Sequence, residues 1–379
     1  MSKKEIRVAL IGHQFMGIAH SNAYRNAAMW TDLPVRLIMK CLCANDTIDN
    51  LKTFATRYGW ESCETDWRDV IKRDDIDLVS IATPNYLHKE IAIEAAKNGK
   101  HILCEKPLAN NLNDAREMLN AVNTAGVKSC CGFSYRFTPS LAFARQMVLE
   151  GRLGRIYHVF ARYAQDWITN PAFGMVWRFD KKIAGSGPLG DLSAHSIDAT
   201  RFVTGLTFNE VSGNLQTLIK ERPVDSNNPN GPKGKVTVDD VAQFLVNFNG
   251  GATGCYESTR LATGRKNYNS IEVNGEKGSL VWNFEDQNYL MFYDNEQSSQ
   301  EAGFRKINVT HEIHPYNGGW WPQGHGLGYA DLFVIEVAGF IRSIIQKLPF
   351  SPDFEDGVKC QEVLEAIEHS AVNRAWVKV

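Results

Sequence analysis

The chain has 379 residues, of which 44% are apolar and 22% charged, and its formal net charge is −2. This length favours two domains over one. The composition is typical of soluble globular proteins and excludes collagen-like and disordered chains. The nearly neutral charge argues against a nucleic-acid or acidic-membrane partner. No apolar run is long enough to predict a membrane-spanning helix.

The amino terminus, Met1–Arg7, leads directly into the strand-like run Val8–Gly12, without an apolar leader or a small-residue cleavage site. The eight cysteines are scattered, and several lie in apolar strand-like runs. They lack zinc-ligand spacing, so we expect free thiols in a reducing environment. Both observations predict a cytoplasmic protein.

Residues 6–131 alternate short apolar runs with helical patterns, which predicts βαβ units, a mostly parallel sheet and helices on both of its faces. The expected strands are Arg7–Ile11, Val35–Cys43, Leu78–Ala82, His101–Cys104 and Val127–Cys131. The expected helices are Ala19–Ala28, Asp49–Tyr58, His88–Asn98 and Leu112–Ala125.

Beyond residue 131 the pattern changes to longer alternating segments joined by turns, which indicates an α+β domain with a large, mostly antiparallel open sheet. The expected strands are Arg155–Ala164, Glu210–Leu218, Ala242–Asn247, Ala252–Thr259, Asn269–Asn274 and Gly278–Phe284. Residues 222–235 contain three Pro, two Gly and three Asn and predict a surface loop. Helical patterns return at Leu332–Lys347 and Gly357–Asn373.

The first strand ends in a glycine-bearing turn that resembles a dinucleotide fingerprint. Glycines of that fingerprint allow a tight turn, close approach of the pyrophosphate and close packing of helix on strand. Here Gln14 stands at the middle glycine position. A turn with no ligand is the alternative, but its place before a helix N-terminus favours phosphate binding. The candidate cofactor residues are Gly12, Gln14, Phe15, Met16 and Gly17.

The end of the second strand indicates which nicotinamide cofactor is used. It carries Asn45 and Asp46 and no nearby basic residue except Lys40, earlier on the strand. A carboxylate here suits the ribose of NAD, whereas NADP needs a cation for its 2′-phosphate. The sequence therefore favours NAD over NADP. Asp46 comes later than the usual spacing, so a role as a helix cap is the alternative.

Two further segments stand where parallel strands end, the edge at which α/β sheets bind ligands. One is Ala82–His88, with the cofactor candidates Thr83, Pro84, Asn85 and His88. The other is Cys104–Leu108, which contains the triplet Glu105, Lys106 and Pro107. Either segment alone could be a turn punctuated by proline.

Together with the first turn, these segments resemble the Gfo/Idh/MocA oxidoreductase family, in which Glu-Lys-Pro is the most recognisable motif. The second half adds Trp177 and Arg178, then an Asp-x-x-x-His segment with Asp191 and His195. Tyr135 and Arg136 resemble the opening of the family's second domain, with Ser134 in place of the usual Asn. Within the family the chain most resembles inositol and levoglucosan-type dehydrogenases, through Gln165–Trp167 and His314–Tyr316.

The resemblance implies a Rossmann domain at 1–131 and a substrate-binding and oligomerisation domain at 132–379, assembled into a dimer or tetramer. It implies oxidation of a secondary hydroxyl of a sugar or cyclitol by NAD. Glu105, Trp177 and Arg178 would then act on the cofactor side.

The residue types suit this chemistry. His195 titrates near neutral pH and can accept the hydroxyl proton as a general base. Lys106 can stabilise the developing alkoxide. Asp191 would share a helix face with His195 if Gly190 begins a helix, and could bind neighbouring hydroxyls or orient the imidazole. A metal site is disfavoured because no third ligand is visible. A satisfied interior histidine is the inert alternative for His195.

The candidate substrate residues combine aromatic faces with planar hydrogen-bonding groups. They are Lys106, Tyr135, Arg136, Asp166, Trp167, Arg178, Asp191, His195, Trp320 and His325, with Trp321 as a further aromatic candidate. Each Trp could equally be core packing or a subunit contact.

Two other functions remain open from the sequence. The first is an enzyme that retains NAD and uses transient oxidation for epimerisation, elimination or transfer between sugars. The second is a non-catalytic ligand-binding regulator, against which the joint presence of Lys106 and His195 counts.

Overall fold

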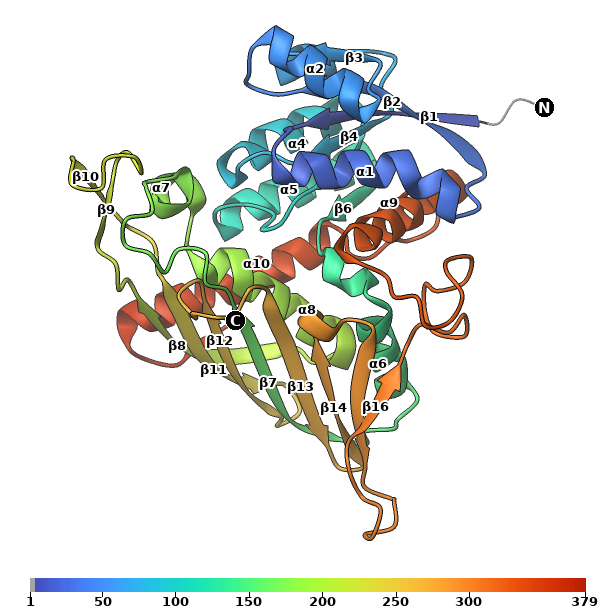
Figure 1. Ribbon diagram of the computed structural model, residues 1–379, viewed down its shortest axis with the longest axis vertical. Helices are drawn as coiled ribbons and strands as arrows, with labels where there is room; N and C mark the ends of the chain where they lie inside the picture. Colours follow the sequence, from blue (N-terminus) through green and yellow to red (C-terminus); the bar gives the residue numbers. More distant parts are fainter. Residues whose placement is uncertain (1–3) are drawn as a thin grey trace. The chain divides into compact units, whose positions relative to one another are not determined.

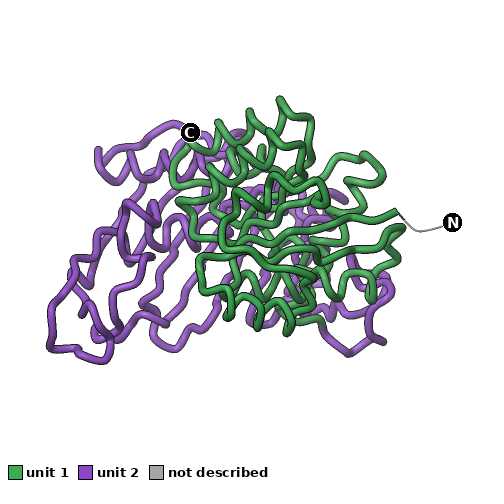
Figure 2. Tube along the Cα trace, turned by 90° about the horizontal axis from the view of Figure 1, so that it is seen from above, with its two compact units in different colours: residues 1–137, 327–358 green, residues 138–326, 359–379 purple. Residues whose placement is uncertain are grey.

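The computed structural model describes residues 4–379. The chain divides into two compact units, coloured separately in Figure 2. Unit 1 runs to Phe137 and resumes at Leu327–Val358, and unit 2 comprises Thr138–Gly326 and Lys359–Val379. The domain limits expected from the sequence, 1–131 and 132–379, stay a prediction. The prediction that no leader segment precedes the first strand involves residues 1–3, which lie outside the described residues.

Unit 1 is built on a six-stranded parallel sheet with the order β3-β2-β1-β4-β5-β6 (Figure 1). All four residues of β4 are buried, as expected of a strand covered on both faces. The strands are β1 (Lys4–Ile11), β2 (Val35–Cys43), β3 (Ser62–Glu64), β4 (Leu78–Ile81), β5 (His101–Cys104) and β6 (Ser129–Cys131).

The helices of unit 1 form two groups, with α1 packed against α2 and α9, and α4 packed against α3 and α5. Right-handed crossovers on either side of the central β1 place such groups on opposite faces of the sheet. The helices are α1 (Phe15–Trp30), α2 (Ile48–Tyr58), α3 (Trp67–Ile71), α4 (His88–Lys97), α5 (Leu112–Ala125) and α9 (Tyr329–Gln346). Short 3-10 turns occupy Asn85–Leu87 and Ser134–Phe137.

Unit 2 is built on a nine-stranded sheet with the order β16-β15-β14-β13-β7-β12-β11-β8-β17. Its pairs are antiparallel except β7 with β12. The strands are β7 (Ile156–Ala164), β8 (Phe208–Gln216), β11 (Val241–Phe248), β12 (Thr253–Thr259), β13 (Tyr268–Gly275), β14 (Gly278–Asn283), β15 (Tyr289–Asp294), β16 (Arg305–Asn308) and β17 (Val377–Lys378). The predicted fold class is confirmed for both parts of the chain.

One face of this large sheet is covered by α6 and α8. The helices of this region are α6 (Pro139–Leu149), α7 (Lys181–Ala184), α8 (Ala194–Thr204) and α10 (Phe354–Asn373), with 3-10 turns at Trp177–Phe179 and Phe284–Asp286. Burial alternates along β7 and β11, so every second side chain points away from the helices. Phe160 and Leu245, each 49% exposed, lie on that outer face.

The surface loop expected at 222–235 is only partly a loop. Its two ends pair as the short antiparallel strands β9 (Glu221–Pro223) and β10 (Lys233–Lys235). Arg222 is fully buried, with its guanidinium donating to the carbonyls of Ile168 and Asn170. The prediction was wrong at the ends because tertiary contacts, which composition does not reveal, order them.

Between residues 4 and 379, no helix is both long and apolar enough to cross a bilayer.

Candidate active site

The turn between β1 and α1 needs glycine at both ends. Gly12 has φ +108°, and a Cβ on it would lie 2.3 Å from the carbonyl oxygen of Ala82. A Cβ on Gly17 would lie 2.3 Å from the carbonyl oxygen of Gly12. Gln14, the N-cap of α1, is exposed and makes no side-chain capping bond. The first amides of α1 are thus left uncapped by Gln14, as a phosphate-binding helix start requires.

The end of β4 carries a buried polar atom that suits a ligand. Thr83 Oγ1 is buried and has no hydrogen-bond partner in the described part of the chain. Two residues further on, Asn85 begins a 3-10 turn that leads into α4. A buried hydroxyl without a partner costs free energy, so a bound molecule that supplied one would be favoured.

His88, predicted as a cofactor residue, lies behind this edge and is fully buried. Its Nδ1 is 3.1 Å from Pro107 O and 3.3 Å from Leu108 O, and its Nε2 is 3.1 Å from Thr83 O. Burial lowers the pKa of His88 below its ordinary value. The ring is therefore neutral near pH 7 and lies between the two predicted ligand loops.

Lys106 follows β5 and is only partly buried, whereas the side chains of residues 102–105 and 107–109 are all buried. Glu105 is 5% exposed, and its Oε1 is 2.9 Å from His20 Nε2. The predicted roles of Lys106 and Glu105 stay predictions. His20 comes from α1, 85 residues away in the chain, and was not recognised as part of the site from the sequence.

Beyond the end of β2, both carboxylate oxygens of Asp46 have partners within the chain. Its Oδ1 accepts hydrogen bonds from Thr47 N and Asn50 Nδ2, and its Oδ2 lies 2.9 Å from His13 Nε2. These bonds lower the pKa of Asp46, with the Asn50 amide the largest cause. Asp46 thus anchors the start of α2, whose N-cap is Thr47. Its contact with a ribose, and that of the exposed Asn45, stay predictions.

In unit 2, Asp191 forms an ion pair that the sequence did not reveal. Its Oδ2 is 2.6 Å from Nη2 of Arg260, the residue after β12, and Arg260 is 1% exposed. Asp191 lies in a π-helical turn, Leu189–Ser193, rather than at the start of a regular α-helix. Just before it, buried Asp239 accepts hydrogen bonds from Gly187 N and Leu189 N and fixes this turn.

His195 lies in the first turn of α8, beside an amide-rich group on the sheet. Its ring centroid is 5.8 Å from that of Tyr163, and His195 is 7% exposed. Tyr163 Oη donates to Asn267 Oδ1 at 2.6 Å, and Gln165 Nε2 donates to the same oxygen at 3.0 Å. Trp167 Nε1 donates to Gln165 Oε1 at 3.1 Å. An imidazole, amides, a phenol and an indole are thus gathered along the ends of β7 and β13.

Arg178 adds positive charge to this region. Burial lowers the pKa of Arg178, while the charge of Asp191 acts to raise it and that of Arg260 to lower it. Its guanidinium lies 4.3 Å from the Trp177 ring centroid. Arg260 in turn lies 5.4 Å from the Trp167 ring centroid, and its Nε and Nη1 are buried without an acceptor among the described residues. The structure thus brings together Asp191, Arg178, Trp167 and the unpredicted Arg260.

Other candidates have local partners. Asp166 accepts from Lys266 Nζ at 2.7 Å, the main cause of its lowered pKa. Arg136 is 4% exposed and pairs with Asp356 at 3.2 Å. Tyr135 is 5% exposed. Trp320 and His325 lie in the segment between β16 and α9, where His325 Nδ1 faces Pro322 O at 3.0 Å. Contact of these side chains with a substrate stays a prediction.

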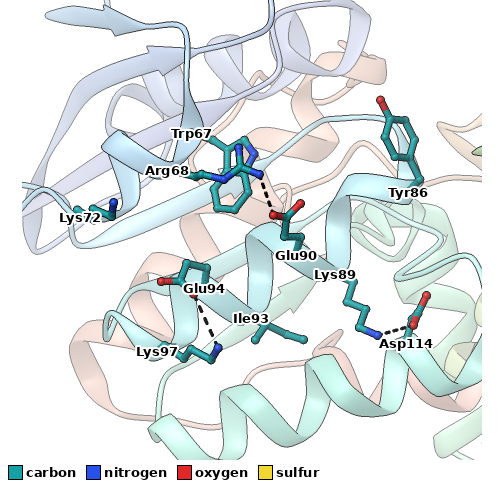
Figure 3. A pocket seen from close by; sticks show the side chains of 10 residues that line it. All are labelled: Trp67, Arg68, Lys72, Tyr86, Lys89, Glu90, Ile93, Glu94, Lys97 and Asp114. Atoms are coloured by element: carbon teal, nitrogen blue, oxygen red, sulfur yellow. Dashed lines mark hydrogen bonds and ion pairs between the residues drawn. The ribbon is translucent and has the colours of Figure 1, made fainter.

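A cavity of about 510 Å³ opens between α3, α4 and the start of α5. Figure 3 shows its ten lining residues, none of which is a predicted site residue. Six of its seven charged side chains pair with one another: Arg68 with Glu90, Lys89 with Asp114, and Lys97 with Glu94. The seventh, Lys72, is not joined to another of the drawn lining residues. Within residues 4–379, no group of three His, Cys, Asp or Glu side chains could hold a metal ion.

Comparison with known proteins agrees with this geometry. Residues 6–133 match the model of the oxidoreductase family with an NAD-binding Rossmann fold, and residues 141–281 match the GFO/IDH/MocA C-terminal domain. The chain belongs to the Gfo/Idh/MocA oxidoreductase family. It is 40% identical to levoglucosan dehydrogenase of Pseudarthrobacter phenanthrenivorans, over 99% of this chain and 98% of that protein.

Solved structures of Gfo/Idh/MocA relatives are also similar. An oxidoreductase domain protein from Kribbella flavida is 46% identical, with a TM-score of 0.96 and 99% of each chain covered. Levoglucosan dehydrogenase in complex with NADH and L-sorbose is 40% identical, with a TM-score of 0.95 and 99% of each chain covered. The family and the levoglucosan-type resemblance predicted from the sequence are confirmed.

This member of the Gfo/Idh/MocA family is an enzyme, an NAD-dependent oxidoreductase of CH–OH groups. Its own residues fit the dinucleotide: glycine at 12 and 17, the uncapped start of α1, and the buried Thr83 hydroxyl without a partner. Lys40, the one basic residue noted near the second strand's end, lies 2.8 Å from Glu61 and 3.6 Å from Asp75. That pairing agrees with NAD as the cofactor.

Proposed function

We propose that this enzyme oxidises a secondary hydroxyl of a sugar or cyclitol. The observation that carries the proposal is a group of polar and aromatic side chains in unit 2. Asp191 pairs with Arg260, and the His195 ring lies beside Tyr163. Hydrogen bonds join the side chains of Asn267, Gln165 and Trp167. Carboxylates and amides can bind neighbouring hydroxyls, and aromatic faces pack against apolar faces of a ring. Levoglucosan dehydrogenase, a relative at 40% identity, binds NADH and L-sorbose.

In the proposed reaction His195 is the general base. The proton must leave the hydroxyl as the C–H bond breaks, and a neutral imidazole within hydrogen-bond reach can accept it. The nicotinamide of bound NAD supplies the hydride acceptor. Low solvent exposure of His195 keeps bulk water from competing for that proton.

Lys106 is proposed to stabilise the alkoxide. Lys106 is the one partly exposed residue in a run of buried neighbours at the carboxyl end of β5, the edge at which parallel sheets bind ligands. A cation beside the developing negative charge lowers the barrier by electrostatic stabilisation. The mechanism requires Lys106 and His195 to reach the same hydroxyl.

Asp191 is proposed to bind a hydroxyl next to the reacting one. Because Arg260 holds its Oδ2, the carboxylate has a fixed orientation. An oriented carboxylate accepts hydrogen bonds from substrate hydroxyls and selects one face of the ring. Of the two roles considered for Asp191, this one has support from the Arg260 contact.

The test is the rate of NADH formation at 340 nm with a panel containing levoglucosan, myo-inositol, scyllo-inositol, glucose and L-sorbose. At least one compound should reduce NAD, and His195→Asn and Lys106→Met should each lower kcat by about 10²- to 10⁴-fold. NADH binding, followed by its fluorescence, should be retained in both variants. Fully active variants would refute the assigned roles.

The panel also separates the other two functions. An enzyme that retains its cofactor through a closed redox cycle would convert a sugar without accumulating NADH. A regulator would bind ligands with no turnover, and Lys106→Met would leave its behaviour unchanged.

We further propose a homo-oligomer, a dimer or tetramer. The outer face of the large sheet carries Phe160 and Leu245, each 49% exposed in the single chain. Apolar groups on a broad open sheet face favour burial against another copy. Sedimentation equilibrium gives the mass directly, and a monomer at micromolar concentration would refute the assembly.

We propose that the protein works in the cytoplasm, because all eight cysteines are free thiols and six of them are buried. Free thiols persist in reducing compartments. Fractionation of cells that express the native gene tests this location.

A further inference from the structure

The loop that carries Lys106 is bounded by buried histidines from two other parts of unit 1. His20, from α1, is 1% exposed and lies on one side of the loop. His88, from the start of α4, is 0% exposed and lies on the other. Neither contact depends on anything in unit 2.

His20 holds Glu105, the residue before the lysine. His20 Nδ1 is 2.8 Å from Ser80 Oγ, and its Nε2 is 2.9 Å from Glu105 Oε1. The other oxygen, Oε2, accepts the backbone N–H of Lys106 at 3.3 Å. If the Ser80 hydroxyl donates to Nδ1, the neutral ring donates from Nε2 to the carboxylate. Three contacts then form a series, from Ser80 to His20, from His20 to Glu105, and from Glu105 to the backbone N–H of Lys106.

This series resembles a hydrolase triad only in residue types. Ser80 lies within β4 and is 0% exposed, so no substrate can reach its hydroxyl. The series is therefore suited to holding Glu105 in place rather than to chemistry of its own.

His88 holds the residues after the lysine. Its Nδ1 faces the carbonyl oxygens of Pro107 and Leu108, and its Nε2 faces that of Thr83. The ring spans the distance between the end of β4 and the lysine loop. A neutral imidazole has one N–H, so it donates on one side only, and the unprotonated nitrogen faces its carbonyl oxygen without a hydrogen bond. We place the N–H on Nδ1, toward Pro107 and Leu108.

We propose that His20 and His88 are positioning residues that together fix Lys106 for catalysis. A lysine side chain has four rotatable bonds, so the position of its ammonium depends on where the backbone holds the Cα atom. Fixing the backbone on both sides of residue 106 narrows the range of those positions. Displacement of a catalytic group by about 1 Å can lower a rate by about 10²-fold. The inference rests on the proposed role of Lys106.

Asparagine and glutamine can each be placed at residues 20 and 88, and we expect the more active of the two substitutions to differ between these positions. Glutamine places its amide near the position of Nε2 and asparagine near that of Nδ1. At residue 20 the loop contact is made by Nε2, so H20Q should retain more activity than H20N. At residue 88 the loop contact is made by Nδ1, so H88N should retain more activity than H88Q.

The measurement is kcat with the best substrate of the panel described above, together with NADH affinity by fluorescence. The weaker variant at each position should lose about 10- to 100-fold in kcat, a larger factor than the accompanying change in the Kd for NADH. H101Q is the control, since His101 lies at the opposite end of β5 and accepts from Lys128 N. It should keep the wild-type kcat. The proposal would be overturned if the same substitution, asparagine or glutamine, gave the higher kcat at both positions, or if all four variants were fully active.

A double-mutant cycle separates positioning from general loss of structure. In a K106M background, H20N and H88Q should cause no further fall in kcat, because the group they position is gone. Losses that multiply would contradict the proposal.

Hydrogen exchange of the backbone amides of residues 104–106, 108 and 109 gives a readout independent of turnover. Exchange should rise in H20N and H88Q and stay as in wild type in H101Q. If K106M itself proved fully active, the proposed function of Lys106 would fail, and amide exchange would still show whether the histidines hold the loop. Unchanged exchange in both variants would refute the holding contacts themselves.

Discussion

Arg260 Nη2 and Asp191 Oδ2 lie 2.6 Å apart, and they join the residue after β12 to a π-helical turn 69 residues earlier in the chain. The arginine side chain is 2% exposed and that of the aspartate 30%. The buried partner thus orients the more accessible one, as expected of a carboxylate presented to a ligand.

Removal of this arginine should damage both stability and activity. Arg260→Met removes the ion-pair partner of Asp191. The loss of one partner from a buried ion pair costs about 3–5 kcal/mol, and the partial exposure of Asp191 lowers the expected loss below that range, to about 2–3 kcal/mol. The KM for the sugar should rise because the carboxylate is no longer oriented. Urea unfolding and steady-state kinetics measure the two effects.

The control for Arg260→Met is Arg305→Met. Arg305 pairs with Asp294 at 3.5 Å near the edge of the same sheet, where both side chains are about one third or more exposed. Such pairs contribute about 0–1 kcal/mol. Equal losses in the two variants would show that burial of the Arg260–Asp191 pair has no special effect.

Cofactor preference follows from the neighbours of Lys40. Its ammonium is held by Glu61 and Asp75, and Asp46 places a further negative charge at the end of β2. A 2′-phosphate would meet carboxylates rather than a cation. We expect kcat/KM for NAD to exceed that for NADP by at least about tenfold, as measured with one sugar and both cofactors. Comparable values would require a phosphate-binding cation elsewhere.

Several elements were predictable because their signal is local. The strands β2 and β5 and the helix α5 have the predicted bounds, since long apolar periods and caps such as Asn111 mark them. By contrast, β3 and α3 have three and five residues, too few to produce a period. Helix α9 was expected near its observed position, but its packing on α1 depends on tertiary contacts.

The candidate site likewise contains residues that the sequence indicated and residues that it did not. Motif spacing indicated Lys106, Asp191 and His195, whose roles stay proposals. It gave no signal for His20 or Arg260, because each meets its partner across 69 or more residues. The shared helix face of Asp191 and His195 was conditional on a helix that begins at Gly190; the structure has a π-helical turn at Leu189–Ser193, which local propensity does not predict. Pairwise contacts of this kind require the folded chain.

Gly12 should tolerate no side chain. Its φ of +108° disfavours any L-residue, and an added Cβ would meet the backbone of Ala82 at 2.3 Å. Backbone at Ala82 cannot move without shifting the end of β4. We therefore expect Gly12→Ala to destabilise the protein by more than about 2 kcal/mol and to abolish NADH binding. Thermal unfolding and NADH fluorescence test both expectations.

Gly59→Ala isolates the conformational part of that cost. Gly59 has φ +87° at the end of α2, and an added Cβ meets nothing within 4 Å. Only the left-handed conformation is penalised there, so about 1 kcal/mol should be lost and NADH binding kept. If the two alanine variants behaved alike, the close approach at Gly12 would not matter.

The buried His88 should make the fold sensitive to mild acid. Burial lowers its pKa in the folded state below the value of about 6.5 expected in the unfolded chain. Below about pH 6.5 the unfolded chain therefore binds a proton that the folded chain does not. The free energy of unfolding contributed by this group is complete above that pH and is lost as the pH falls, with a limiting slope of about 1.4 kcal/mol per pH unit.

His88→Asn removes the titrating ring, so its unfolding free energy should fall less steeply than that of the wild type between pH 7.5 and pH 5.5. Urea denaturation at several pH values gives both slopes, and contributions from groups common to the two proteins cancel in the difference. His369→Gln, which removes an exposed histidine of α10, controls for the loss of any imidazole. A wild-type slope in His88→Asn would mean that the ring at position 88 takes up its proton equally well in the folded and unfolded chain.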